Sequence, residues 1–406
     1  MTKVIGIDLG TTFSAIASLD DLGNPEVLAS IEDNRKITAS AVYLKDNEVI
    51  VGDKALTYLK DQSNNVILQT KREMENDVVY STDQGKWVSD TDLVDAYTPA
   101  QVSALILKKL KEYTSDVKKV VITVPAMFAE KARQATLDAA KIADLEVIEL
   151  INEPTAAVLH YASLPGVEVG GRVMIFDLGG GTFDVTFAEV KNKKVDVLTS
   201  RGDKYLGGRD FDNEITKLMK KKYFDIHNVE IDIENNKQYL HKAEEVKKIL
   251  SVKDKANIEI NGPKGLQKIE ITQDEFEESI QTYIEKIKML IEEAMDASGM
   301  NPSRINQTLL VGGSTRMPII TKVLTQLMGK APVKGVNVDE AVVCGAAIYA
   351  GLKTEKEILS DEQQEALKDV NLTDVCNFYM GTLALITDTH TNRRVVANTI
   401  IIERDA

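Results

Sequence analysis

The N-terminal stretch alternates short apolar segments with turn residues in a way that predicts a β-meander. Residues 3–8 (KVIGID) are mostly apolar, as in a buried strand, and the turn GTT separates them from a second apolar segment at 13–19 (FSAIASL). The turn sequence DDLGNP then precedes a third predicted strand at 26–30 (EVLAS). We therefore expect three antiparallel strands with a short glycine-containing loop between the first two.

The second half of the chain repeats this plan. A strand-like segment at 172–177 (RVMIFD) is followed by the turn GGGT, a second predicted strand at 183–190 and, after KNKK, a third at 195–200. The tripeptide DLG at 8–10 recurs at 177–179, at the same place in the pattern. Because the strand–turn–strand context recurs together with the tripeptide, we favour a duplicated architecture over a chance echo.

A helical pattern follows the first meander. Thr98 is a candidate N-cap, Pro99 stands at the first helical position, and Gln101 completes a capping box at the start of an amphipathic segment that reaches residue 113. The almost continuously apolar stretch VVITVP at 120–125 is typical of a parallel strand that is covered on both faces.

The second meander is followed by a longer predicted helix. This helix begins with a capping box formed by Thr272 and Glu275 and stops at Gly299. Its apolar stripe consists of Phe276, Ile280, Ile284, Ile287 and Ile291. Another buried strand and a glycine turn follow at 308–318, and strands that alternate with helices in both halves predict an α/β fold.

Composition narrows the class of protein. A chain of 406 residues exceeds one ordinary core, so two or more domains are expected, and its net charge of −14 disfavours a nucleic-acid surface. The two cysteines, Cys344 and Cys376, suit neither a disulfide scaffold nor a zinc site. No apolar run approaches the roughly 18 residues of a membrane span. We expect a cytoplasmic protein that binds neither nucleic acid nor membranes.

The glycine turns between strands suit a chain of phosphates. Backbone N–H groups reach an anion closely where side chains are absent, and neither a helix-based P-loop nor GxGxxG occurs in the sequence. Two facing hairpin loops, one from each half, would hold a polyphosphate between them. A single aspartate beside such a turn is more often a turn former. Two of them in matched contexts, Asp8 and Asp177, predict residues that hold the waters of a Mg²⁺ ion.

Several long motifs, in order, carry a family resemblance. The sequence contains IDLGTTFS, ITVPAMF, INEPTAAVLHYA, FDLGGGTFDV, LGGRDFDN, AEEVKKILS, LLVGGSTRMP and NVDEAVVCGAAIYAG. This set resembles the signatures of the seventy-kilodalton heat-shock chaperone family over about residues 3–357. Actins and sugar kinases share the implied fold but not these motifs.

The resemblance implies an actin-like ATPase fold with two duplicated lobes, of ribonuclease H-like cores, around a nucleotide cleft. Lobe I would comprise residues 1–166 plus 335–358, and lobe II residues 167–334 with an outer subdomain at about 205–284. An interdomain linker would occupy 359–375. Residues 376–406 would begin a peptide-binding β-domain, and we expect the chain to be a truncated form of a longer chaperone.

The resemblance also implies the site. ATP would be bound and slowly hydrolysed to ADP with Mg²⁺ and K⁺ present. Asp8 and Asp177 would serve the metal, and the catalytic residues would be Lys71, Glu153, Thr182 and Asp184. The nucleotide would be bound by Gly10, Thr11, Thr12, Gly179, Gly180, Gly181, Gly207, Gly208, Glu244, Lys247, Lys248, Ser251, Gly312, Gly313, Ser314, Arg316 and Asp339. From the residues alone, solvated surface is the favoured interpretation of both the Lys71 region and the charged segment 243–251, and only the resemblance changes this.

Partners follow from the same resemblance. A monomeric chaperone of the stress response would work with a J-domain co-chaperone, a nucleotide exchange factor and unfolded client peptides. Glu149 stands where the family often has the arginine that J-domains use, which puts that partner in doubt. Arg209 stands where the family usually has an acidic residue, and the sequence offers no functional explanation for this reversal of charge. In the linker, Asn371 and Thr373 replace usual leucines, which would weaken docking by roughly 1–3 kcal/mol each if those positions are buried.

Other functions stay open at this point. A small-molecule kinase on the same fold would consume ATP only with an acceptor such as a sugar or acetate. An actin-like filament protein would sediment with ATP, and a nucleotide-binding scaffold would bind ATP without hydrolysing it.

Overall fold

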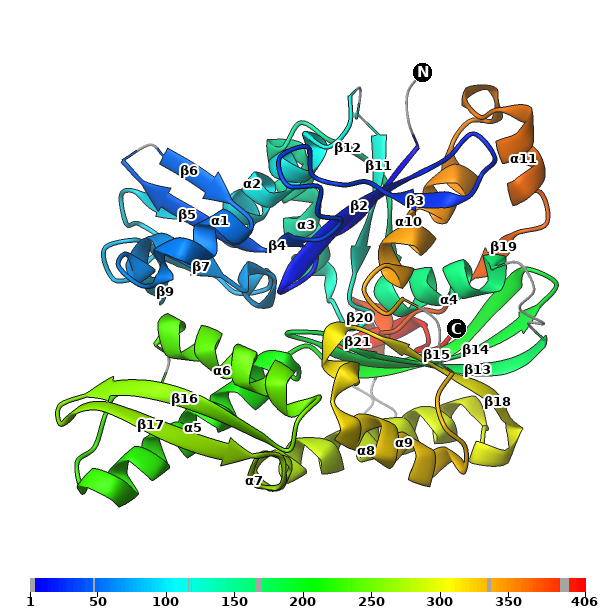
Figure 1. Cartoon of the computed structure of the whole chain (residues 1–406). Helices are drawn as coiled ribbons and strands as arrows, with labels where there is room; N and C mark the ends of the chain where they lie inside the picture. Colours follow the sequence, from blue (N-terminus) through cyan, green and yellow to red (C-terminus); the bar gives the residue numbers. More distant parts are fainter. Residues whose placement is uncertain are drawn as a thin grey trace.

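Two β-sheets with helices between and around them form the centre of the protein (Figure 1). The computed structural model describes residues 4–46, 48–115, 117, 119–164, 170–234, 236–333, 337–387 and 394–406. The expected lobe boundaries at 166/167 and at 335 lie outside these residues. Within the described parts of the chain, no helix is both long and apolar enough to cross a bilayer.

The first sheet has the strand order β12-β11-β1-β2-β3, and β4 also pairs with β2. The meander predicted at the N-terminus is confirmed, because β2 pairs antiparallel with both β1 and β3, and β11 and β12 extend the sheet in parallel. The bounds are β1 Ile5–Asp8, β2 Phe13–Leu19, β3 Pro25–Val27, β4 Thr38–Ala39, β11 Lys119–Val124 and β12 Glu146–Asn152.

The second sheet has the order β18-β13-β14-β15-β19 and repeats the first. Its meander is also confirmed: β14 pairs antiparallel with β13 and β15, and β18 lies parallel to β13. The strands are β13 Gly170–Leu178, β14 Phe183–Lys191, β15 Lys194–Asp203, β18 Ile305–Val311 and β19 Asn371–Thr373. Both DLG tripeptides therefore stand at the end of the first strand of a meander.

Two helices, α4 (Glu153–Ser163) and α10 (Ala341–Lys353), lie between the sheets (Figure 1). One buried apolar cluster contains residues of both sheets and both helices. The helices approach closely at Gly345, where an added Cβ would lie 1.8 Å from the Ala156 carbonyl oxygen. Only glycine fits such an approach, so this residue fixes how the two halves pack.

The remaining elements form the outer parts of each half. Small sheets are made by β5 Ala41–Lys45, β6 Glu48–Val51 and β7 Val66–Leu68, by β8 Val79–Ser81, β9 Lys86–Val88 and β10 Ala96–Tyr97, and by β16 Lys255–Gly262 and β17 Gly265–Thr272. The helices are α1 Asp53–Leu56, α2 Pro99–Lys111, α3 Glu130–Ile142, α5 Gly208–His227, α6 Lys237–Leu250, α7 Gln273–Ser279, α8 Gln281–Ser298, α9 Pro318–Met328 and α11 Asp361–Leu367.

The capping boxes predicted for the helix starts are confirmed. In α2 the Thr98 side chain accepts from the Gln101 backbone and the Gln101 side chain accepts from Thr98 N, and Thr272 and Glu275 do the same at α7. The expected single helix up to Gly299 is wrong, because α7 ends at Ser279 and α8 begins at Gln281. The Ser279 hydroxyl donates to Phe276 O at 2.7 Å and competes with the Ile280 amide, at 3.2 Å, for that carbonyl.

The C-terminal part is attached to the second sheet. Strand β19 pairs in parallel with β15, and the half-buried Leu372 packs against the apolar cluster between the sheets. Asn371 and Thr373 are exposed. The weaker docking expected from these two polar residues required them to be buried, so that expectation does not apply. A hairpin of β20 (Met380–Thr387) and β21 (Arg394–Ile402) follows, and Asp405 pairs with Arg201 at 2.8 Å.

A half-buried histidine on α4, His160, predicts a loss of stability in acid. Burial lowers the pKa of His160 to about 4, and its Nδ1 atom has no hydrogen-bond partner among the described residues. Between pH ~6.5 and ~4 the unfolded chain binds a proton at His160 that the folded chain does not bind. The free energy of unfolding therefore decreases as the pH is lowered through this range. The total loss should be about 3 kcal/mol.

Urea unfolding at a series of pH values checks this, with wild type compared to His160→Phe. The free-energy difference between the two proteins should shift in favour of the variant as pH falls below about 6.5. Parallel pH dependences of the two unfolding free energies would contradict the assignment.

Candidate nucleotide site

A cavity of about 980 Å³ lies between the two halves and is lined from both of them. Most of the predicted site residues line it, and the exceptions are Gly181, Asp184 and Gly207. The lining set contains Asp8, Gly10, Thr11, Thr12, Lys71, Glu153, Asp177, Gly179, Gly180, Thr182, Gly208, Glu244, Lys247, Lys248, Ser251, Gly312, Gly313, Ser314, Arg316 and Asp339. The structure thus brings together residues that lie far apart in the sequence.

The two glycine loops face each other at close range. A Cβ at Gly180 would lie 1.9 Å from Thr12 Oγ1, and one at Gly181 would lie 2.7 Å from Thr11 Oγ1. Side chains at these positions would therefore force the loops apart. Gly208 N also donates to Gly179 O at 2.9 Å, which fixes the start of α5 on the second loop.

Carboxylates gather at the base of the cavity. Asp177 and Asp184 are cross-strand partners on β13 and β14, while Glu153 begins α4 and Asp8 ends β1. Lys71, on a 3₁₀ turn at Thr70–Glu73, is buried and forms an ion pair with the buried Glu153. The Thr123 hydroxyl donates to Asp8 at 2.8 Å, and Ala126 N donates to Asp184 Oδ2 at 3.1 Å.

Burial and mutual repulsion make these acids weaker. Burial is the main cause that raises the pKa of each one, well above its usual value for Asp177 and to about 7 for Asp184. The charge of Glu153 raises both of these values further, and Lys71 opposes the shifts. The other oxygen of Asp184, Oδ1, is buried with no hydrogen-bond partner among the described residues.

The carboxylates fit a hydrated cation better than a directly coordinated one. No group of three or more His, Cys, Asp or Glu in the described ranges is arranged to hold a metal ion by itself. Mg²⁺ keeps several waters and takes hard carboxylate oxygens together with phosphate oxygens. Asp8 and Asp177 can hold such waters, because they stand beside the two loops and carry the right oxygens.

Helix α6 lines the opposite side of the cavity. Lys247 pairs with Asp212 at 2.8 Å and donates to Gly208 O at 2.9 Å, and Lys248 pairs with Glu244 at 2.8 Å. Burial raises the pKa of Asp212 to about 6 despite the nearby Lys247. Sequence reasoning missed Asp212, although it lies in the quoted segment LGGRDFDN and its partner was predicted.

The glycine turn that begins at Gly312 also lines the cavity. Ser314 Oγ donates to Gly179 O at 2.9 Å, and Arg316 makes a two-pronged contact with Asp339 at 2.8 and 2.6 Å. The predicted residues Gly312, Gly313, Ser314, Arg316 and Asp339 are therefore neighbours in space as well as lining residues.

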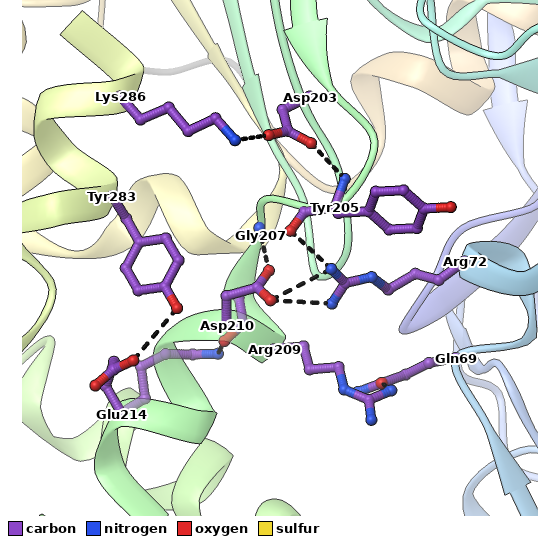
Figure 2. Close-up of polar contacts among 12 residues, drawn as sticks. Gln69, Arg72, Asp203, Tyr205, Gly207, Arg209, Asp210, Glu214, Tyr283 and Lys286 are labelled. Atoms are coloured by element: carbon purple, nitrogen blue, oxygen red, sulfur yellow. Dashed lines mark hydrogen bonds and ion pairs between the residues drawn. The ribbon is translucent and has the colours of Figure 1, made fainter. Parts of the chain in front are cut away.

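Further contacts tie the two halves together over the cavity (Figure 2). The Arg72 guanidinium donates to Asp210 at 3.3 Å and to Tyr205 O at 2.7 Å, and that of Arg209 donates to Gln69 Oε1. Lys237 donates to two backbone carbonyls across the gap, Ser63 O at 3.0 Å and Val66 O at 2.8 Å. These contacts bridge the two halves directly.

Glu149, the departure noted at the proposed J-domain position, is already paired. It accepts from the Tyr349 hydroxyl at 2.8 Å and pairs with Lys353 at 2.7 Å, and both partners belong to α10. Its charge is thus directed toward the helix between the sheets.

The carboxylate cluster predicts that Asp177→Asn stabilises the protein without ligand. The substitution keeps the size of a buried side chain and removes repulsion from Glu153, Asp184 and Asp8. The free energy of unfolding should rise by about 1–2 kcal/mol. Denaturant unfolding without Mg²⁺ or nucleotide measures this, with the exposed Asp196→Asn on β15 as the matched control. A destabilised Asp177→Asn would show that the carboxylate has a structural partner.

Comparisons with known proteins give a consistent result. Residues 4–405 match the family model described as Hsp70 protein. The chain is 36% identical to the "Chaperone protein dnaK" of Thalassiosira pseudonana over 94% of this chain and 66% of that protein. It is 37% identical to that of Thermosipho africanus (93% and 62%) and 36% identical to that of Trieres chinensis (94% and 64%). The chain thus spans slightly less than two thirds of the length of these relatives.

Proposed function

Because the chain belongs to the Hsp70 family, we propose that it binds ATP in the cleft between its halves and hydrolyses it slowly as the ATPase part of a molecular chaperone. The resulting conformational switch passes through residues 359–375 to a peptide-binding domain. The mixed α/β content and the family together confirm the expected actin-like fold.

One observation carries the proposal: two glycine loops face each other above a group of carboxylates and a buried lysine, in one cavity. The loops offer backbone N–H groups to phosphates, and the carboxylates offer oxygens to a hydrated Mg²⁺. A triphosphate with its metal supplies both kinds of ligand. We assign phosphate binding to Gly10, Thr11, Thr12, Gly179, Gly180 and Gly181.

The residues at the base of the cavity then have distinct roles. Lys71 stabilises charge that develops on the terminal phosphate, and its pair with Glu153 holds it in place. Glu153 and Thr182 orient the attacking water, and Asp184 accepts its proton. A carboxylate whose pKa lies at about 7 is suited to proton transfer at neutral pH. Asp8 and Asp177 would hold a hydrated Mg²⁺, which would neutralise phosphate charge, and by family analogy K⁺ would also be required.

The adenosine end of the nucleotide is assigned to the opposite side of the cavity. Glu244, Lys247, Lys248 and Ser251 of the α6 region would contact the ribose and the base edge. Gly207, Gly208, Gly312, Gly313, Ser314, Arg316 and Asp339 would close the site around them. The ion pairs of Lys247 and Arg316 support this assignment, because they hold both side chains at the cavity wall.

We propose the following domain division. Lobe I consists of residues 1–166 and 335–358, lobe II of 167–334 with its outer part at about 205–284, and 376–406 begin the peptide-binding domain. The separate sheets and the parallel pairing of β19 with β15 support this division.

The proposed partners are a nucleotide exchange factor, unfolded peptides and a J-domain co-chaperone, acting on a cytoplasmic monomer. At the position where the family often has the arginine that J-domains use, this chain has Glu149, which is paired with Tyr349 and Lys353. A co-chaperone of this protein would therefore need a different charge pattern at that surface.

Steady-state ATP turnover tests the proposal. The purified chain with Mg²⁺ and K⁺ should release phosphate slowly with no acceptor present, and Lys71→Ala should reduce the rate by about 100-fold or more. The exposed Lys268→Ala is the matched control and should keep the wild-type rate.

Two outcomes would contradict this function. Phosphate transfer only in the presence of a sugar or acetate would identify a small-molecule kinase. Tight ATP binding without any turnover would identify a scaffold.

A further inference from the structure

Arg209 is attached directly to the second glycine loop. It is the second residue of α5, and its backbone N–H donates to Gly180 O at 2.8 Å, next to the bond from Gly208 N to Gly179 O. Its main chain therefore has a fixed position relative to the loop that we assign to phosphates.

The Arg209 side chain extends from this anchor across the cleft. Its Nη1 donates to Gln69 Oε1 on the other half of the protein, two residues before Lys71 (Figure 2). Arg209, Gln69 and Lys71 all line the same cavity. The guanidinium thus lies beside the segment of the other half that carries Lys71. Burial and then the nearby charge of Arg209 lower the pKa of Lys237, so the guanidinium also lies near the start of α6.

The charge of Arg209 is poorly compensated. No carboxylate of the described residues lies within 4.0 Å of its guanidinium, while the neighbouring Arg72 takes Asp210. Burial, followed by the charge of Arg72, lowers the pKa of Arg209, and the more distant charges of Asp210, Glu73 and Asp212 oppose this shift only in part. An arginine does not lose its proton in a protein, so a half-buried cation faces a neutral amide and a like charge. An anion that entered the cavity would compensate the positive charge of Arg209.

We propose that Arg209 contacts the terminal phosphate of bound ATP, as a second cation that comes from the half of the protein opposite to that of Lys71. The inference rests on the proposed function and deepens it. The guanidinium exchanges the Gln69 oxygen for phosphate oxygens, which match its planar set of donors. The contact favours ATP over ADP, because ADP lacks the phosphate that it reaches.

The test compares the affinities of a non-hydrolysable ATP analogue and of ADP, both with Mg²⁺, by competition with a fluorescent nucleotide. Arg209→Gln should weaken the ATP analogue about tenfold and ADP less than about threefold, since one charged hydrogen-bonded contact is lost. Arg209→Glu should weaken the analogue further, and it places an acid where the family commonly has one.

Two further variants keep the result interpretable. Lys221→Glu reverses a charge at an exposed position of the same helix and should leave both affinities within about twofold of wild type. Gln69→Ala removes the partner but leaves Arg209 in place, so the preference for ATP over ADP should persist. If Gln69→Ala reproduced the loss seen with Arg209→Gln, Arg209 would act only as a bridge between the halves.

The remaining outcomes also decide the matter. Equal weakening of both nucleotides, or no weakening of either, would overturn the contact while the proposed function stood. A wild-type chain that bound neither nucleotide would refute the proposed function, and the contact with it.

Discussion

Carboxylates that are taken out of water repel one another, and the base of this cleft holds Asp8, Glu153, Asp177 and Asp184 around the ammonium group of Lys71. Each carboxylate stands at the end of a strand or at the start of a helix or strand whose other residues belong to the cores. The cores therefore determine where the charges lie, and the charges cannot move apart without loss of packing. Protonation or nearby cations must offset this repulsion, and the Mg²⁺ that accompanies a polyphosphate would supply positive charge at this place.

Local sequence rules predicted the parts of the fold that depend on neighbouring residues. The capping boxes at Thr98 and Thr272 and both meanders are confirmed, because caps, turns and apolar alternation are properties of short segments. The division between α7 and α8 at Ile280 escaped prediction, since the apolar stripe runs through it without interruption. A serine hydroxyl that competes for one carbonyl leaves no trace in hydrophobic periodicity.

Local motifs likewise predicted only part of the candidate site. Paired DLG turns indicated the loops and two carboxylates, whereas Lys71 and helix α6 could be placed only through the family resemblance. Pairs such as Asp212 with Lys247 and Arg209 with Gln69 depend on how the outer parts of the two halves meet, which no local pattern encodes. The expected weakening of docking by Asn371 and Thr373 also depended on tertiary structure, because it required these residues to lie on the buried face of β19. Both are exposed.

Direct contacts connect the cleft to Asp374 in the proposed linker. Asp374, directly after β19, accepts hydrogen bonds from Asn152 and Thr155, both at 3.0 Å. These two residues flank Glu153 at the start of α4, and Glu153 is the partner of Lys71. A change in the charge around Lys71 thus acts on a residue whose chain neighbours hold the linker. The proposed switch needs two arrangements of such an element to be biased by nucleotide. The start of α4 is suited to that role, because one short segment carries both the cleft carboxylate and the contacts to Asp374.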